Sequence, residues 1–186
     1  MKIIKIGSRN IGDSYEPFII AEISANHNQS LNTAKKLIRA AAKSGVDAIK
    51  LQTFLPENLT LDTNNKDFKI KDKKSPWYGY RLFDLYDKAF TPWKWHKPLF
   101  HLAKKLGVIA FSSIFDERDV DRLNKLGVPA FKIASFENNH FPLIKKVLDT
   151  NKPLIISLGA TTKDEIFELI NLTKKHKNKK VIFLKC

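Results

Sequence analysis

Short apolar runs alternate with longer amphipathic stretches along most of this chain. The apolar runs span four to six residues, as in FIIAEI, AIKLQT and PLIIS, and are rich in β-branched side chains. The stretches between them carry apolar residues at spacings of three and four. Runs of the first kind predict buried strands, and stretches of the second kind predict helices. The alternation indicates an α/β protein with a parallel sheet.

The pattern also sets the expected bounds of each element. Strands are expected at residues 18–23, 48–52, 108–112, 130–134, 154–157 and 181–184. Helices are expected at residues 31–44, 81–90, 92–106, 116–126, 141–149 and 162–176. Gly45 is expected to end the first helix, and Thr91 and Pro92 to begin the third as its N-cap and first helical residue. Residues 53–91 are expected to form a long, mostly irregular insertion.

Six strands without a G-x-G-x-x-G motif favour a TIM-type (β/α)8 barrel over a dinucleotide-binding fold. A closed barrel has eight strands and about 250 residues. The chain is therefore either a barrel truncated after its sixth strand or a part that a partner completes. We expect an α/β barrel truncated after its sixth strand, because an open six-stranded sheet would expose unpaired backbone at its edges. Residues 1–186 would form the N-terminal part of the barrel domain, with a β-hairpin at 1–16 that turns at 8–13 and six βα units at 18–186.

Composition and charge narrow the partners. The single cysteine, Cys186, excludes an internal disulfide, and no apolar run is long enough for a membrane helix or has the form of a secretory signal. A cytoplasmic protein without membrane contact is expected. The net charge of +14 raises nucleic acid as a partner. However, most lysines are scattered over helical faces, so nucleic acid is not expected, and part of the charge could instead steer an anionic substrate.

Polar residues recur where the apolar runs end. Because parallel strands open onto one face at their carboxyl ends, these side chains should converge there. The residues concerned are Glu22, Lys50, Gln52, Ser113, Lys132, Ser135, Glu137 and Ser157. We call the carboxyl ends of these strands, with the polar residues just named, the mouth. Two lysines, two carboxylates and several hydroxyls at the mouth indicate an enzyme with an anionic substrate.

Six segments of the chain together resemble a known family. They are AEISANHNQSLNTAKKLI, DAIKLQT, LYDKAFTPWKWH, FSSIFD, VPAFKIASFE and PLIISLG. In order and without a gap, they resemble the sialic acid synthases, and most closely the branch that makes pseudaminic acid. The resemblance covers the chain from about residue 1 to Cys186.

The resemblance implies a transferase activity. Family members condense phosphoenolpyruvate with an open-chain acetamido sugar, for this branch a 2,4-diacetamido-2,4,6-trideoxy hexose, to give a nonulosonic acid and phosphate. They are homodimers with a C-terminal antifreeze-like domain, which this sequence lacks. They use Mn or Mg, whose ligands are expected on later strands, outside this chain. The alternative is a non-catalytic fragment, or a phosphoenolpyruvate-binding half that needs a separately encoded C-terminal part.

The resemblance also implies roles for the residues at the strand ends. Lys50 and Lys132 are expected to bind the phosphate and carboxylate of phosphoenolpyruvate. Glu22 is expected to contact sugar hydroxyls or the attacking water, with an acid/base role. These three are the predicted catalytic residues. The structural alternatives are lysines that extend toward solvent and ion pairs of Glu22 with Lys50 and of Glu137 with Lys132.

The other matched residues are predicted to bind substrate. Ser113, Ser135 and Ser157 would contact the same anion, or cap strand ends as ordinary serines do. Gln52 would be a polar contact beside Lys50 or a hydrogen bond within the mouth, and Glu137 would orient a lysine or bind the sugar. Asn26 and His27 are expected to organise a loop and contact substrate, and His27 is not expected to bind metal.

Two positions depart from the family pattern. Ile114 stands where the family has a proline, and Leu158 stands where it has a hydroxyl residue. The second change is expected to weaken phosphate contacts, since the lost hydroxyl would lie near the anion site.

Overall fold

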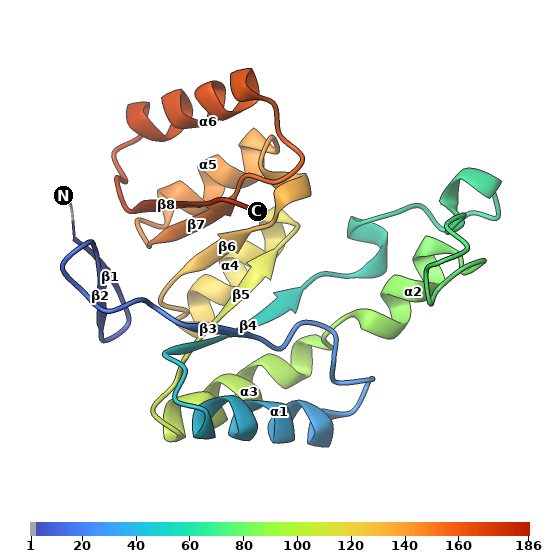
Figure 1. Cartoon of the computed structure of the whole chain (residues 1–186), viewed down its shortest axis with the longest axis horizontal. Coiled ribbons are helices and arrows are strands. Elements are labelled where there is room, and N and C mark those ends of the chain that lie inside the picture. Colours follow the sequence, from blue (N-terminus) through green and yellow to red (C-terminus); the bar gives the residue numbers. More distant parts are fainter. Residues whose placement is uncertain (1–2) are drawn as a thin grey trace.

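A six-stranded parallel sheet, curved into half of a barrel, forms the body of the protein (Figure 1). The computed structural model describes residues 3–186. The strands follow one another in chain order across the sheet: β3 (Ile20–Glu22), β4 (Ala48–Thr53), β5 (Ile109–Ile114), β6 (Phe131–Ile133), β7 (Leu154–Ser157) and β8 (Val181–Leu184). Such an order is typical of (β/α)8 barrels, whereas a doubly wound sheet reverses its order at the centre. The predicted fold class is confirmed.

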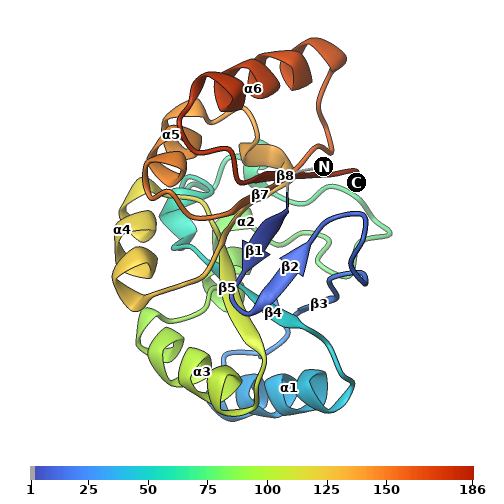
Figure 2. The ribbon, with the colours of Figure 1, turned by 90° about the vertical axis from the view of Figure 1, so that its left-hand side faces the viewer.

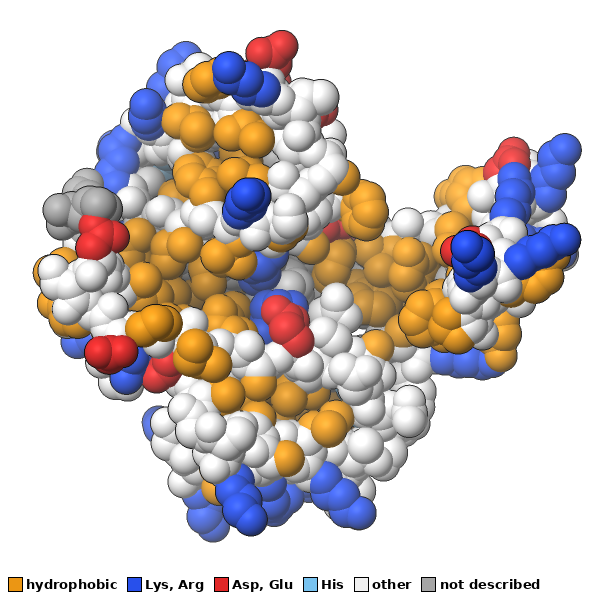
Figure 3. All heavy atoms as spheres, viewed as in Figure 1, with side chains coloured by type: hydrophobic (Ala, Val, Ile, Leu, Met, Phe, Trp, Pro, Cys, Tyr) orange, Lys and Arg blue, Asp and Glu red, His pale blue; other side chains and the backbone are white. Residues whose placement is uncertain are grey.

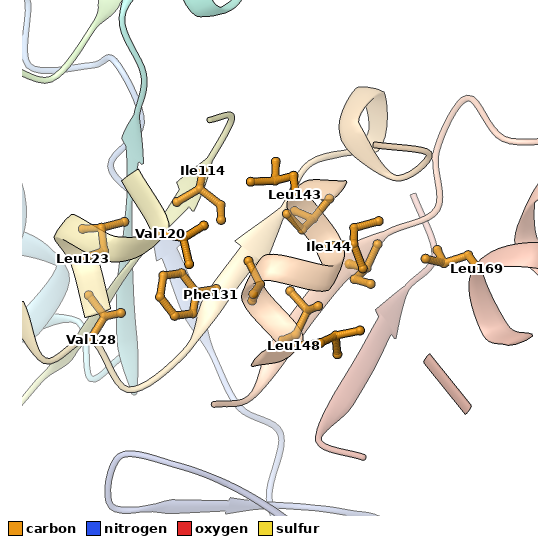
Figure 4. Close-up of a cluster of buried hydrophobic side chains, with 13 residues drawn as sticks. Ile114, Val120, Leu123, Val128, Phe131, Leu143, Ile144, Leu148 and Leu169 are labelled. Carbon is orange, nitrogen blue, oxygen red and sulfur yellow. The ribbon is translucent and has the colours of Figure 1, made fainter. Parts of the chain in front are cut away.

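Helices connect the strands and cover the convex side of the sheet (Figure 1). They are α1 (Leu31–Lys43), α3 (Trp93–Lys105), α4 (Glu117–Leu126), α5 (Phe141–Asp149) and α6 (Lys163–Lys175), whereas α2 (Leu82–Ala89) lies away from the sheet. Alternate residues of each strand face these helices because successive side chains point to opposite sides. The largest cluster joins β6 and β7 to α4 and α5, and Figure 4 shows Phe131, Leu143 and Leu148 packed within it.

The concave side of the sheet is apolar near the amino ends of the strands. Ala48, Phe111, Ala130 and Ile155 are buried there, together with Ile6 from the N-terminal hairpin. Toward the carboxyl ends the same alternation places lysines and hydroxyls on this side. The apolar layer therefore forms a floor beneath the polar mouth.

The N-terminal hairpin consists of β1 (Ile4–Ile6) and β2 (Arg9–Ile11), which pair antiparallel. Figure 2 shows it in front of the amino ends of the strands. The expected turn at residues 8–13 is wrong, because the chain reverses at Gly7 and Ser8 and the second strand occupies 9–11. Gly7 makes the early turn possible, since its φ is +57°. A Cβ at Gly7 would lie 2.9 Å from Cδ1 of Ile109, so close packing on β5 also requires glycine.

Several expected boundaries shift. The first parallel strand is shorter than the apolar run 18–23, and β5 continues past residue 112 to Ile114. Gly45 follows α1 with φ +80°, as expected for a residue that ends a helix. Thr91 is not an N-cap, because Pro92 holds that position without a side-chain cap. The Thr91 hydroxyl is instead hydrogen-bonded to His27.

The insertion between β4 and α3 forms an arm that extends away from the body (Figure 1). It contains the 3-10 helices η1 (Pro56–Asn58) and η2 (Lys66–Phe68) as well as α2. Thr53, expected at its start, belongs to β4. No helix within residues 3–186 combines the length and apolar character needed to span a membrane.

A buried polar network links the arm-side end of the sheet to α3. The Thr53 hydroxyl lies 2.7 Å from Nε2 of His96 and 2.7 Å from the Ser112 hydroxyl. Nδ1 of His96 lies 3.2 Å from the carbonyl of Trp93, which can only accept, so Nδ1 carries the proton. Burial lowers the pKa of His96 to about 4. The imidazole is therefore neutral in the folded protein at pH 7.

The buried network predicts acid sensitivity. Since the unfolded state binds a proton at His96 near its ordinary pKa of 6.5, stability is lost as pH falls from about 6.5 to about 4. The free energy of unfolding that the protein loses between pH 7 and pH 4 should be about 3 kcal/mol smaller when Gln replaces His96. Urea unfolding of wild type and H96Q at pH 7 and pH 4 measures the free energy of unfolding at each pH. The variant H101Q, at an exposed histidine of the same helix, is the control. An equal pH dependence in wild type and H96Q would contradict the assignment.

Candidate active site

The polar residues at the strand ends converge on the concave side of the sheet. Glu22 is the register partner of Lys50, Gln52 of Ser113, and Ser113 of Lys132. These pairings run across four neighbouring parallel strands and place the side chains in two adjacent rows, Glu22 with Lys50 and Gln52 with Ser113 and Lys132. Figure 3 shows acidic and basic side chains in the hollow at the middle of the body, with apolar surface around them. The expected convergence is confirmed.

Lys50 is the centre of the first group. Its ammonium lies 2.7 Å from Oε2 of Glu22 and donates to the Ser113 hydroxyl at 3.0 Å. Lys50 is buried, whereas the Glu22 side chain is 56% exposed. The ion pair considered as a structural alternative is therefore present. Glu22 compensates the charge of Lys50 only partly, because water solvates the exposed carboxylate and weakens the ion pair.

Lys132 is the centre of the second group. Its ammonium donates to the Ser157 hydroxyl at 2.6 Å and to the Ile133 carbonyl at 2.7 Å. The side chain is buried. Burial, and next the positive charge of Lys50, lower the pKa of Lys132 to about 8. Lys132 is thus a buried cation whose hydrogen-bond acceptors are all neutral, and an anion beside it would favour its charged form.

Glu137 lies in the short 3-10 helix η3 (Ser135–Glu137) that follows β6. The alternative ion pair with Lys132 is not formed among residues 3–186, and Oε2 of Glu137 is buried without a hydrogen-bond partner there. Burial raises the pKa of this carboxyl group. An unpaired buried carboxyl oxygen is uncommon, so Glu137 is available to a ligand at the mouth.

Ser135 and Gln52 complete the predicted set at the mouth. Ser135 Oγ would lie 2.7 Å from a Cβ at Gly159, so the connection after β7 approaches Ser135 closely only because residue 159 is glycine. Gln52 is half-buried on β4, and within residues 3–186 its side chain makes no hydrogen bond. Among residues 3–186 the Gln52 side chain is therefore free for a ligand, whereas the Ser135 hydroxyl lies beside the Cys186 thiol.

The loop between β3 and α1 contains two candidate residues, Asn26 and His27, which lie in different surroundings. Asn26 is exposed, and its amide donates to the Ile23 carbonyl at 3.2 Å. His27 is fully buried, accepts at Nδ1 from the backbone of Gln29, and contacts Thr91 through Nε2 at 3.2 Å. This position favours loop organisation for His27 over contact with a substrate.

Asn138 is a site residue that the sequence pattern did not indicate. Its buried side-chain amide donates to the carbonyls of Ser157 and Gly159, and also to the Thr161 hydroxyl. It therefore ties the connection after β7 to the turn after β6. An asparagine a few residues beyond a strand end carries no periodic signal, and only the fold shows which groups it contacts.

The two departures from the family pattern lie on the helix-facing side. Ile114 is fully buried in the core cluster between β5, β6 and α4. Leu158 packs against the same cluster, and its backbone N–H donates to Leu184 at 2.9 Å. The expected loss of phosphate contacts through Leu158 is therefore not supported, because the side chain points into the core.

A divalent metal does not fit the side chains at this mouth alone. Within residues 3–186, no three His, Cys, Asp or Glu side chains are grouped so that they could hold a metal ion. Glu22 is paired with Lys50, and Glu137 faces the charge of Lys132. The cationic environment favours anions and disfavours a metal ion.

A parallel half-barrel whose strand ends carry buried lysines and hydroxyls defines the class of β/α-barrel proteins, whose binding sites lie at the carboxyl ends of the strands. Comparison with known families specifies the class further. The chain belongs to the NeuB family, whose model matches residues 37–186.

Named relatives are similar over most of the chain. The pseudaminic acid synthase of Campylobacter jejuni is 42% identical over 177 residues, which is 95% of this chain and 51% of the relative. That of Helicobacter pylori is 43% identical over 170 residues, covering 91% and 49%. The chain thus spans about half the length of the curated relatives it matches.

Solved structures agree with this fold. The N-acetylneuraminic acid (sialic acid) synthetase of Leptospira borgpetersenii, solved in complex with citrate, aligns with a TM-score of 0.85 at 28% identity. The alignment covers 100% of this chain and 59% of that one.

The lowered pKa of Lys132 has a consequence for stability. Between about pH 8 and pH 10.5 the unfolded state holds this proton and the folded state releases it, so stability rises with pH in that window. The free energy of unfolding of wild type relative to K132M should therefore increase by about 3 kcal/mol from pH 7 to pH 10.5. Urea unfolding at both pH values tests this. The exposed control variant K36M should show no such change, and a flat difference for K132M would contradict the burial argument.

Proposed function

We propose that this chain provides the phosphoenolpyruvate-binding end of a nonulosonic acid synthase. The reaction proposed is the condensation of phosphoenolpyruvate with an acetamido sugar, a 2,4-diacetamido-2,4,6-trideoxy hexose, to a pseudaminic-type acid and phosphate. The observation that carries the proposal is the pair of buried lysines, Lys50 and Lys132, each hydrogen-bonded to a serine hydroxyl at the carboxyl end of a strand.

Electrostatics support an anionic ligand at this position. Lys50 and Lys132 are close enough for the charge of one to lower the pKa of the other. Only Lys50 has a bonded carboxylate within residues 3–186, and that carboxylate is largely exposed. A ligand with both a phosphate and a carboxylate group would neutralise the two cations and accept from Ser113 and Ser157.

In the proposed condensation, the main role of the lysines and serines is to bind and orient phosphoenolpyruvate. C3 of phosphoenolpyruvate bonds to the aldehyde carbon of the sugar, and water adds at C2, where positive charge develops. The bond from C2 to the phosphate oxygen then breaks, phosphate leaves, and C2 becomes the keto carbon. One proton of the water goes to the aldehyde oxygen, and the second leaves the C2 hydroxyl with the phosphate. Lysines that hold the phosphate stabilise its departure.

The two carboxyl groups suit different steps. Glu22 is exposed at the rim and charged by its pairing with Lys50, so we assign it to a sugar hydroxyl or to the attacking water. Glu137 is buried with a raised pKa and an unpartnered oxygen, so we assign it to a hydrogen bond with the substrate. Gln52, Ser135 and Asn26 are assigned to further polar contacts, and Asn138 to positioning Ser157.

The second candidate is a binding half without turnover of its own. The observation that favours it is the cationic group without any cluster of metal-ligand side chains in residues 3–186. Phosphate release by the chain, supplied with phosphoenolpyruvate, divalent metal and the diacetamido sugar, separates the candidates. Little or no release, with retained binding, is expected of the chain alone; robust turnover would contradict the binding-half hypothesis.

Calorimetric titration with phosphoenolpyruvate tests the assigned cations. Because a charge-assisted hydrogen bond contributes about 1.5–3 kcal/mol, K50M and K132M should each weaken binding roughly 10- to 100-fold. S113A and S157A, which keep both charges, should weaken it less.

The matched control is K36M, which removes the same charge from an exposed position on α1. It should bind as wild type does. Equal weakening by K36M, K50M and K132M would show that the net charge of +14 attracts the anion without a site. Circular dichroism of each variant identifies any loss of folding.

A further inference from the structure

A second cavity lies at the opposite end of the half-barrel from the lysine mouth. It has a volume of about 720 Å³ and opens between the hairpin turn, the second half of α3, the start of β5 and the connection from α4 to β6. Figure 2 views the molecule from this side, with the hairpin in front. Ligand pockets of proteins commonly enclose about 300–1,000 Å³, so this cavity could hold a small organic molecule.

The floor of the cavity is apolar. Phe100 of α3, Ile109 of β5, and Leu126, Val128 and Pro129 of the α4–β6 connection line it. Three glycines, Gly7, Gly107 and Gly127, also line it and contribute no side chains. A flat apolar body could therefore lie against this floor.

The wall formed by α3 is cationic. Lys97, His101 and Lys104 line the cavity from this helix. Their spacing of four and three residues places them on one helical face. None of the three side chains forms an ion pair or hydrogen bond with another side chain in residues 3–186, and no Asp or Glu lines the cavity. The helix dipole explains a lysine in the last turn, as at Lys104, but not Lys97 in the second turn.

We propose that this cavity binds an aromatic organic anion, with its ring on the apolar floor and its acidic group at Lys97 and Lys104. This site is separate from the lysine mouth. Ile109 and Ser113 stand four residues apart on β5, which corresponds to about 13 Å along the strand. The inference does not depend on phosphoenolpyruvate binding.

The glycine amides of the chain allow a direct test by NMR. The probe is 8-anilinonaphthalene-1-sulfonate, titrated into the ¹⁵N-labelled chain, and its uncharged counterpart N-phenyl-1-naphthylamine. The sulfonate should shift the amides of Gly7, Gly107 and Gly127 together, and leave Gly79 on the arm and Gly159 at the mouth unchanged. The uncharged compound should bind at least tenfold more weakly.

Matched double variants complete the test. K97Q/K104Q should weaken sulfonate binding at least tenfold, whereas K36Q/K43Q removes two exposed lysines at equivalent places on α1 and should leave it unchanged. Three results would each overturn the proposal: shifts confined to glycines outside the cavity, equal binding of charged and uncharged probes, or equal affinity in the two double variants. A shift of Gly159 by phosphoenolpyruvate reports on the mouth alone, so failure of one site is distinguishable from failure of the other.

Discussion

The burial of two lysine ammonium groups near the carboxyl ends of a parallel sheet is the constraint on which the rest of the site depends. A buried cation is unfavourable unless hydrogen bonds or charges compensate it. Lys50 obtains both from Ser113 and Glu22, whereas Lys132 obtains only neutral acceptors from Ser157 and a carbonyl. Burial, and next the charge of Lys50, therefore lower the pKa of Lys132. The anion proposed to bind at the mouth would supply the missing compensation.

The surroundings hold this unfavourable arrangement in place. Below the lysines, the concave floor is closed by apolar side chains and by Ile6 of the hairpin. Behind them, the strands are fixed by the hydrophobic core cluster against α4 and α5. Asn138 ties the connection that follows Ser157, so the hydroxyl acceptor of Lys132 cannot move independently. Rigidity of this kind lets the fold retain the unfavourable buried charge, since relaxation would require several strands to shift together.

Features set by periodicity could be predicted from the sequence, whereas features set by contacts between distant residues mostly could not. The positions of Lys50 and Ser113 at the ends of apolar runs predicted their convergence, because the carboxyl ends of parallel strands open onto one face. Thr91 was misassigned because its hydroxyl contacts His27, 64 residues away, rather than the helix beside it. Asn138 was missed for the same reason, since its partners lie beyond the next strand. The motif placed Glu137 just beyond a strand end, but that its Oε2 is buried without a hydrogen-bond partner among residues 3–186 depends on the fold around η3.

The two ends of β5 show why the chain can carry two separate sites. Near its carboxyl end, Ser113 faces the lysines, and near its amino end, Ile109 packs on Gly7 and lines the second cavity. Between them Phe111 is fully buried and fills the interior, so no open passage joins the two ends along this strand. The mouth is built from charges buried within strands, whereas the cavity has an apolar floor and charges on a solvent-facing helix. The mouth therefore suits a small, highly charged substrate, and the cavity suits a larger molecule that carries its charge at one edge.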